Sequence, residues 1–290
     1  MKNFFTGIFL FLLAGILVSA QNHTQGKITE AWDYSEIPSD AYQKSYLSVA
    51  SGGNAVSYSS VFGSLAESFR ENIIEEDRYL LILDGLKATL IISVLATLLG
   101  TILGGLICYM SMSRKKWLKL PAEFYISVLV GTPVLVVLMI IFYVIFASVN
   151  IDPVMVAIIA FGLNFAAYFS KMLRTGIESI DRGQTEAGIA LGFSKVKTFV
   201  HIVLPQAINR ILPIYKNEVV TLLKMTSVVG YIAVQDLTKA GDMIRSRTFD
   251  AFFPLIMVAA LYFFISWLIA LLLSQAERKT NPKLKNAENR

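Results

Sequence analysis

The sequence of 290 residues has little of three residue types on which many sites depend. Its one cysteine, Cys108, excludes an internal disulfide framework and a cysteine-cluster metal site. Its two histidines, His23 and His201, are far apart in the chain, so no metal site and no catalytic dyad is expected. Charged residues make up only 16% of the chain against 55% hydrophobic residues. This balance is typical of a polytopic membrane protein and unlike that of a soluble domain.

The formal net charge of +5 raises the question of a nucleic-acid partner. The Lys and Arg residues, however, cluster beside the long apolar segments. That placement is typical of membrane orientation, whereas a nucleic-acid groove interleaves its cations with stacking aromatic side chains. The sequence therefore predicts contact with membrane lipid and no nucleic-acid partner.

The N-terminal end has the features of a secretory signal. A cation precedes a mostly apolar run at 4–18, and the small residues "VSA" close a predicted signal peptide over residues 1–20. An uncleaved anchor is the alternative, because the uncharged stretch 3–25 is long enough to span a bilayer. Either interpretation places the polar segment 21–79 outside the cytoplasm.

Apolar segments long enough to cross a membrane follow in the body of the chain. We expect spans at 88–110, 124–149, 153–170, 218–237 and 251–276. Basic residues after the first, third and fifth predict cytoplasmic sides, so the loops after the second and fourth should face outward. In the first span Gly100 and Gly104 form a pair of small residues that lets another helix approach closely. The expected fold class is an all-α membrane protein with five core helices and a cytoplasmic basic tail, 277–290.

The stretch "EAGIALGFSKVKTFVHIVLP", residues 186–205, differs from these spans. One apolar stripe comprises Ala187, Ala190 and Leu191, and a second comprises Val196, Phe199, Val200 and Val203. Between them Gly192 predicts a left-handed turn, Ser194 a helix cap, and Pro205 the end of the second helix. Two such short helices could lie on the membrane, pack under the bundle, or dock on another protein.

Specific residues of this stretch match a known signature. Glu186, Ala187, Gly192, Ile202, Leu204 and Pro205 stand at the spacing of the "EAA---G---------I-LP" motif, which resembles that of permease subunits of bacterial ABC importers. Further motifs follow in order: "GLKATLIIS" at Gly85, "GTPVLV" at Gly131, "LNFAAYFSKMLRTGIESIDRGQTEA" at Leu163 and "NEVVTLLKMTSVVGYIAVQDLT" at Asn217. Together they are similar to the polar-amino-acid uptake permeases of the histidine and glutamine type.

The resemblance implies a type I importer permease in the bacterial cytoplasmic (inner) membrane, with its transmembrane domain over 80–276 and coupling helices at about 183–205. Implied partners are cytoplasmic ABC ATPase subunits, a second permease copy or relative, and an extracytoplasmic substrate-binding protein. The chain has no GxxxxGK[ST] sequence, so the ATPase would bind ATP–Mg, and this chain would be neither an enzyme nor a cofactor protein. The implied coupling residues are Glu186, Ala187, Gly188, Gly192, Phe199, Ile202, Leu204 and Pro205.

Three residues depart from the family pattern. Gly188 stands where the motif has a second alanine, which predicts a looser first helix by up to ~1 kcal/mol. Lys171 stands where a glutamate is common, and Val130 where an arginine is usual. The departures at Lys171 and Val130 concern charges near the inner face, and all three leave the order of the motifs intact.

Polar residues within the spans are candidates for a substrate pathway. They are Asn164, Tyr168, Glu218, Lys224, Thr226 and Ser227. For an amino-acid substrate, Lys224 would meet the carboxylate and Glu218 the ammonium. In the structural alternative Lys224 snorkels to an interface, Thr226 and Ser227 bond to their own helix, and Asn164 bridges helices.

A secondary transporter or channel that needs no ATPase is the alternative function. Such a protein should show inverted repeats with interrupted helices in matching halves. The sequence predicts only one interrupted span, 218–237, which favours the ATP-driven importer.

Overall fold

The computed structural model describes residues 68–250 and 252–280. The predicted signal or anchor at 1–20, most of the polar segment, and residues 281–290 of the tail lie outside this part. The chain divides into two compact units, Met1–Asp77 and Arg78–Arg290. The described end of the first unit contains a π-helical turn, η2 (Arg70–Ile74), and a 3₁₀ turn, η3 (Glu75–Asp77).

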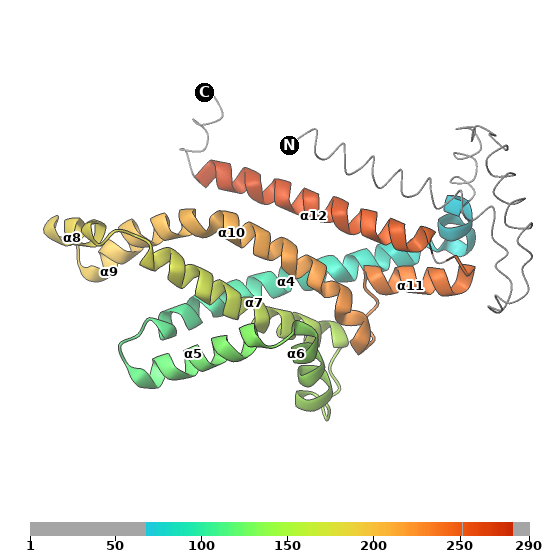
Figure 1. Cartoon of the computed structure of the whole chain (residues 1–290), viewed down its shortest axis with the longest axis horizontal. Helices are drawn as coiled ribbons and strands as arrows, with labels where there is room; N and C mark the ends of the chain where they lie inside the picture. The colour runs from blue at the N-terminus through green and yellow to red at the C-terminus, as the bar shows by residue number, and fades with distance from the viewer. Residues whose placement is uncertain (1–67, 251, 281–290) are drawn as a thin grey trace, which may run out of the picture. The chain divides into compact units, whose positions relative to one another are not determined.

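The described part of the second unit is built from helices and contains no strand, which confirms the predicted all-α class. The helices are α4 (Tyr79–Ser111), α5 (Lys116–Gly131), α6 (Val134–Ile140), α7 (Pro153–Glu178), α8 (Arg182–Ala190), α9 (Lys195–Thr198), α10 (Leu204–Met225), α11 (Leu237–Thr248) and α12 (Phe253–Thr280) (Figure 1). Shorter turns are η4 (Ile141–Ile145), η5 (Phe199–Val203) and η6 (Thr226–Ile232). Helix α7 lies at the centre and packs against α4, α5, α6 and α10.

Three of these helices are long and apolar enough to cross a membrane: Tyr79–Ser111, Pro153–Glu178 and Phe253–Gln275. Two bent helix pairs bring the number to as many as five if each pair is one span. The first, third and fifth predicted spans thus correspond to α4, α7 and α12, and each helix continues past the C-terminal end of the predicted apolar run.

The contact between α4 and α7 is the most extensive in the described chain. Gly100 and Gly104 are buried on the face of α4 that meets α7. A Cβ atom added to Gly100 would lie 2.7 Å from the carbonyl oxygen of Gly162, and one added to Gly104 would lie 2.7 Å from that of Ala166. The expected close helix approach at this glycine pair is therefore confirmed, and only glycine fits at both positions.

Substitution of Gly100 by valine should destabilise the chain by roughly 1–3 kcal/mol, because the added side chain overpacks the α4–α7 contact. The thermal unfolding midpoint of the purified protein in detergent should fall by several degrees. Gly105→Val is the matched control, since a Cβ atom there meets nothing within 4 Å. Equal midpoints for the two variants would contradict the packing argument.

The second span is not the single helix predicted over 124–149. Helix α5 ends at Gly131, α6 begins at Val134, and the two segments are bent by 112°. Thr132 is extended, with φ −112° and ψ 134°, because a residue that precedes proline is disfavoured in helical conformation. Pro133 then caps α6. The "GTP" sequence is therefore a break in the helix, and the prediction of a continuous helix was wrong.

Pro205 does not end a helix, as the sequence predicted, but lies in the first turn of α10. The π-helical turn η5 directly precedes it, and there the backbone N–H of Leu204 donates to the carbonyl of Phe199, five residues back. The helical path runs from Lys195 through η5 and α10 to Ile232. The fourth span therefore starts well before the predicted 218–237.

The predicted outer loop between the fourth and fifth spans is largely a helix, α11, bent by 54° from the preceding segment. The left-handed residue Ala233, with φ +61°, ends η6. Asp236 then caps α11 by accepting hydrogen bonds from the backbone N–H groups of Thr238 and Lys239, each at 3.0 Å. Helix α11 packs on α4 and α12 through a buried face of Leu237, Ala240, Gly241 and Ile244. The sequence signal for this helix is therefore the capping residue Asp236, followed by apolar or small residues at i, i+3, i+4 and i+7 from Leu237.

Candidate functional site

Two places in the fold correspond to the sequence-predicted sites. The first is the α8–α9 hairpin. Its turn is set by Gly192, whose φ of +84° is the predicted left-handed conformation. The backbone N–H of Phe193 donates to the carbonyl of Gly188 at 3.1 Å, which closes the end of α8. Ser194 caps α9 and accepts from the N–H of Lys197 at 3.4 Å, as predicted. The relative orientation of α8 and α9 is therefore set by the turn at Gly192 and by these local hydrogen bonds.

Gly188 has a packing role that sequence reasoning did not find. It is the buried residue of α8, and a Cβ atom there would lie 2.6 Å from Cγ2 of Thr198 and 2.9 Å from Cδ1 of Ile202. The motif's usual alanine would need those side chains to move. The glycine that lowers helix propensity thus lets α8 contact α9 and η5 closely.

The hairpin presents a large apolar surface to its surroundings. Leu191 is 77% exposed and Val196 is 72% exposed, and Ile189, Phe193, Phe199 and Val200 are exposed as well. Glu186, Ala187 and Pro205 are also exposed, whereas Ile202 and Leu204 are partly buried. Of the second predicted stripe only Val203 is buried, where it packs with Ile180 and Ala207. Both stripes thus turn most of their apolar side chains away from the rest of the described chain.

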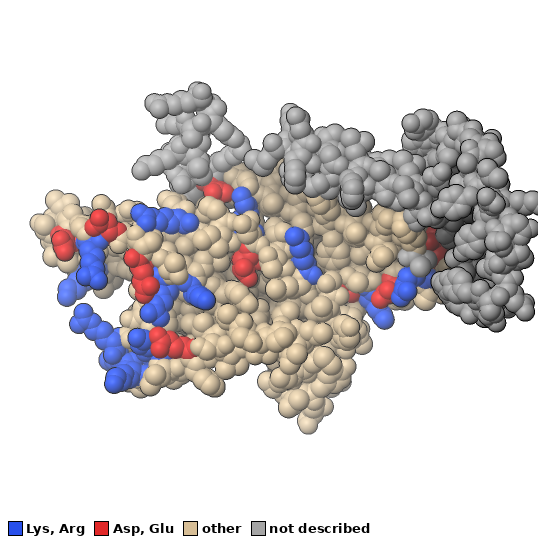
Figure 2. Space-filling model, in the orientation of Figure 1, with Lys and Arg blue, Asp and Glu red and all other residues tan. Residues whose placement is uncertain are grey.

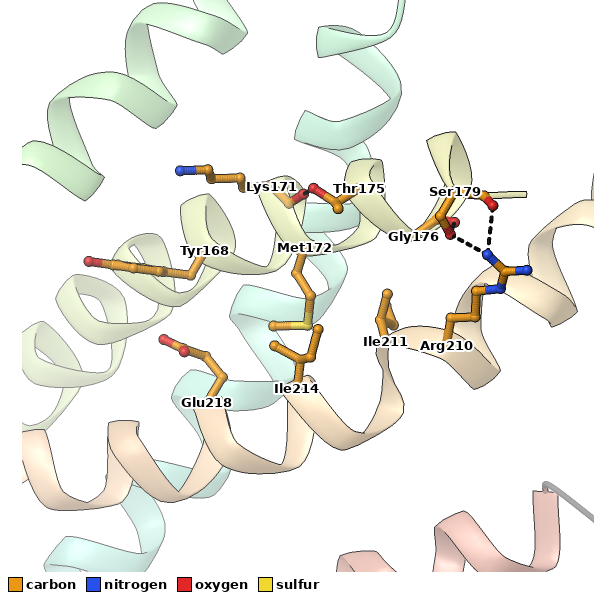
Figure 3. Close-up of a pocket in the computed structure, with 10 residues that line it drawn as sticks. All are labelled: Tyr168, Lys171, Met172, Thr175, Gly176, Ser179, Arg210, Ile211, Ile214 and Glu218. Atoms are coloured by element: carbon orange, nitrogen blue, oxygen red, sulfur yellow. Dashed lines mark hydrogen bonds between the residues drawn. The ribbon is translucent and has the colours of Figure 1, made fainter. Parts of the chain in front are cut away.

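The second place is a groove of about 320 Å³ between α7 and α10 (Figure 3). It is lined by Tyr168, Lys171, Met172, Thr175, Gly176, Ser179, Arg210, Ile211, Ile214 and Glu218. Figure 3 shows Tyr168 and Glu218 at one end, Arg210 and Ser179 at the other, and Met172 with Ile214 between them. The groove therefore has polar ends and an apolar middle.

The charged groups of the groove differ in how they are satisfied. Arg210 donates to the backbone carbonyl of Ser179 at 2.6 Å and to its hydroxyl at 3.1 Å. Lys171 and Glu218 line the groove from opposite helices, yet neither has an ion-pair partner within residues 68–250 and 252–280. Glu218 is half-buried and Lys171 is exposed. In Figure 3 the side chain of Tyr168 lies between these two charged groups.

The groove unites only two of the six predicted pathway residues, Tyr168 and Glu218. Asn164 is buried and donates to the carbonyl of Leu129 at 3.3 Å, so it bridges α7 and α5. Thr226 donates to Leu223 in its own helical path at 2.7 Å. Lys224 is exposed, and neither it nor Ser227 lines the groove.

Sequence reasoning missed Lys171 and Arg210 as groove residues and treated them as part of the cytoplasmic basic pattern. One helical face, at i, i+3, i+4, i+7 and i+11, carries Tyr168, Lys171, Met172, Thr175 and Ser179. That face was visible in the sequence. Its partner was not, since only the packing shows that α10 covers it.

The helices, the hairpin and the groove belong to a known architecture. A family model described as "Binding-protein-dependent transport system inner membrane component" matches residues 96–282. The chain belongs to this family, which confirms the resemblance to the permeases of ABC importers. Several apolar helices agree with the inner-membrane location that the family's description gives.

Similar proteins cover most of the chain. The putative glutamine transport system permease protein GlnP of Rickettsia typhi is 35% identical over 204 residues, 70% of this chain and 94% of its own length. The L-cystine transport system permease protein TcyB of Bacillus subtilis is 33% identical over 214 residues, 73% and 90% respectively. A crystal structure of an amino acid ABC transporter with histidines is 38% identical, with a TM-score of 0.63, over 69% of this chain and 94% of that chain. These relatives confirm the importer-permease fold.

Proposed function

We propose that this chain is the permease subunit of an ATP-driven importer, and that it moves a polar amino acid or a close analogue across the inner membrane. The substrate class is inferred from relatives that are named for glutamine and cystine, and from the similar structure of an amino acid ABC transporter with histidines. The energy would come from a separate ATPase chain, since this sequence has no phosphate-binding GxxxxGK[ST] loop. The permease itself would not be an enzyme.

The observation that carries the proposal is the exposed apolar surface of the α8–α9 hairpin, led by Leu191 and Val196. A short helix pair of this kind fits a hydrophobic cleft on another protein. The path from α9 into α10 has no break between Lys195 and Ile232. A displacement of the hairpin by an ATPase would therefore move Ile211, Ile214 and Glu218 on the wall of the groove.

The proposal fixes the arrangement of the chain in the membrane. The hairpin lies on the cytoplasmic side with the ATPase, residues 21–79 lie outside after a signal at 1–20, and the tail 277–290 is cytoplasmic. A second permease copy or relative completes the pathway, and an external substrate-binding protein delivers the substrate. The transmembrane domain is then 80–276, with coupling helices at about 183–205.

Within this domain the groove is the inner part of the substrate pathway. Its volume of about 320 Å³ is at the lower end of the roughly 300–1,000 Å³ typical of small-molecule sites, which suits a single amino acid. Glu218 meets the ammonium, Tyr168 offers a hydroxyl, and Lys171 meets the carboxylate. Lys171 takes the role that sequence reasoning gave to Lys224, because Lys171 lines the groove.

The test is reconstitution of the purified complex in liposomes, with labelled amino acids and the binding protein outside. Uptake should require ATP in the lumen and should stop when a non-hydrolysable analogue replaces it. The alternative, a secondary transporter, gains one feature from the structure, since two spans rather than one are interrupted. Uptake by the permease alone, driven by an ion gradient without ATPase, would overturn the proposal in favour of that alternative.

A further inference from the structure

The turn between α4 and α5 carries a concentrated positive charge that the proposed transport function does not use. Arg114, Lys115 and Lys116 are exposed, and none of them has an ion-pair partner within the described ranges 68–250 and 252–280. Lys119 pairs only with Glu123, at 3.6 Å on the surface. Figure 2 shows Lys and Arg side chains gathered at this end of the α4–α5 hairpin, at the lower left. The turn therefore presents a surface for a negatively charged group.

Helix α5 continues this surface with an apolar stripe. Trp117, Leu120, Phe124 and Val128 lie on one helical face at i, i+3, i+7 and i+11, and they are 69%, 62%, 72% and 43% exposed. The opposite side of the helix faces inward, where Tyr125 donates its hydroxyl to the carbonyl of Leu163 in α7 at 2.7 Å. The stripe thus points away from the bundle and starts at the basic turn.

The start of α5 adds donors to the same surface. Lys115 is the N-cap residue and has no side-chain cap hydrogen bond. The first N–H groups of a helix of this length carry partial positive charge and favour a phosphate group. The backbone N–H of Lys115 donates to Ser113 Oγ at 3.2 Å, and the N–H groups that follow belong to the same helical turn as Lys116 and Trp117.

We propose that the α4–α5 turn binds an anionic phospholipid, with the headgroup phosphate at Arg114, Lys115 and Lys116 and the acyl chains along the stripe. Cations next to an interfacial tryptophan at the end of a spanning helix are typical of contact with anionic lipid. A water-soluble partner could neutralise the cations, but it could not cover the stripe within the membrane. The proposal rests on the membrane fold alone and is independent of the groove and of the ATPase.

The test uses Trp117 as the reporter. The chain has three tryptophans, so Trp32 and Trp267 are replaced by phenylalanine in the full-length protein, which is then placed in phosphatidylcholine liposomes. Brominated phosphatidylglycerol or brominated phosphatidylcholine is added at equal, low mole fractions, and quenching of Trp117 fluorescence is measured. We expect several-fold stronger quenching by the anionic lipid, and a decrease of this preference at high salt.

The preference is the ratio of Trp117 quenching by the anionic lipid to quenching by phosphatidylcholine. Replacement of Arg114, Lys115 and Lys116 by glutamine should bring this ratio close to one. Lys195→Gln with Lys197→Gln is the control, because it removes two exposed cations from the α8–α9 hairpin and should leave the preference intact. Equal quenching by both lipids in the unneutralised protein would overturn the proposal. Weak quenching by both lipids would also overturn it, since another chain would then cover the stripe. If the neutralised variant kept the preference but less ATPase co-purified with it, the proposal would also be overturned. The three cations would then form a contact with the ATPase and not with lipid.

Discussion

Replacement of Gly192 by valine is expected to reduce uptake by more than tenfold while the chain still inserts in the membrane. Gly192 has φ +84°, a conformation that costs an L-residue roughly 1–2 kcal/mol and a β-branched side chain more. A Cβ atom at this position meets no atom within 4 Å, so the effect arises from the backbone rather than from a clash. Release of the strain would re-aim α9 relative to α8 and disturb the surface that docks on the ATPase. The measurements are uptake in proteoliposomes and the amount of ATPase that co-purifies.

Gly192→Asn is the matched control. Asparagine adopts the left-handed conformation more readily than other non-glycine residues, so this variant should keep most of the uptake and of the bound ATPase. If valine and asparagine gave the same loss, the backbone conformation would not be the cause. If both variants kept full uptake, the hairpin would have no role in coupling.

Loss of the charge at Glu218 or at Lys171 should also reduce uptake by more than tenfold, with the ATPase still bound. These two residues line the α7–α10 groove without an ion-pair partner in the described chain, so each is free to meet one end of a zwitterionic substrate. Glu218→Gln keeps the shape of the side chain, and Lys171→Met keeps its length and apolar contact. The measurement is uptake of labelled amino acid, with ATP hydrolysis followed in parallel to establish assembly.

Lys224→Met is the matched control for Lys171→Met, because Lys224 is exposed and lies outside the groove. The groove predicts a large loss for Lys171 and little change for Lys224. The sequence-based pairing of Lys224 with the carboxylate predicts the reverse order. That reverse order would move the pathway to the far end of α10, whereas full activity of both variants would leave the carboxylate to neutral groups such as Tyr168.

The sequence predicted the features of the fold that depend on neighbouring residues. Uncharged runs marked α4, α7 and α12, and the left-handed turn followed from Gly192 and Ser194. The prolines were harder, since the same residue can end a helix or stand in its first turn. Pro133 follows an extended residue and separates two helices, whereas Pro205 starts α10. The residue before the proline is extended at Thr132 but helical at Leu204, although proline disfavours the helical conformation there, so a rule based on proline alone fails at Pro205.

The groove was only partly predictable for a related reason. Tyr168 and Glu218 were found because polar residues in apolar segments are costly and so call for an explanation. Lys171 was assigned to the inner-side charge pattern, although it shares a helical face with Tyr168. Only the packing of α7 against α10 shows that Lys171 and Glu218 line one groove. Lys171 was missed because sequence periodicity does not show which distant segments pack together.

The unbroken path from α9 into α10 also constrains how permeases of this kind can be recombined. An α-helix turns by about 100° per residue, so one residue added between Ser194 and Ile211 would rotate the groove wall relative to the hairpin. The π-helical turn η5, Phe199–Val203, contributes one residue more than an α-helical turn. It therefore helps to set the angle about the helix axis between the hairpin and the groove wall. Chimeras joined within this segment must therefore keep its residue count.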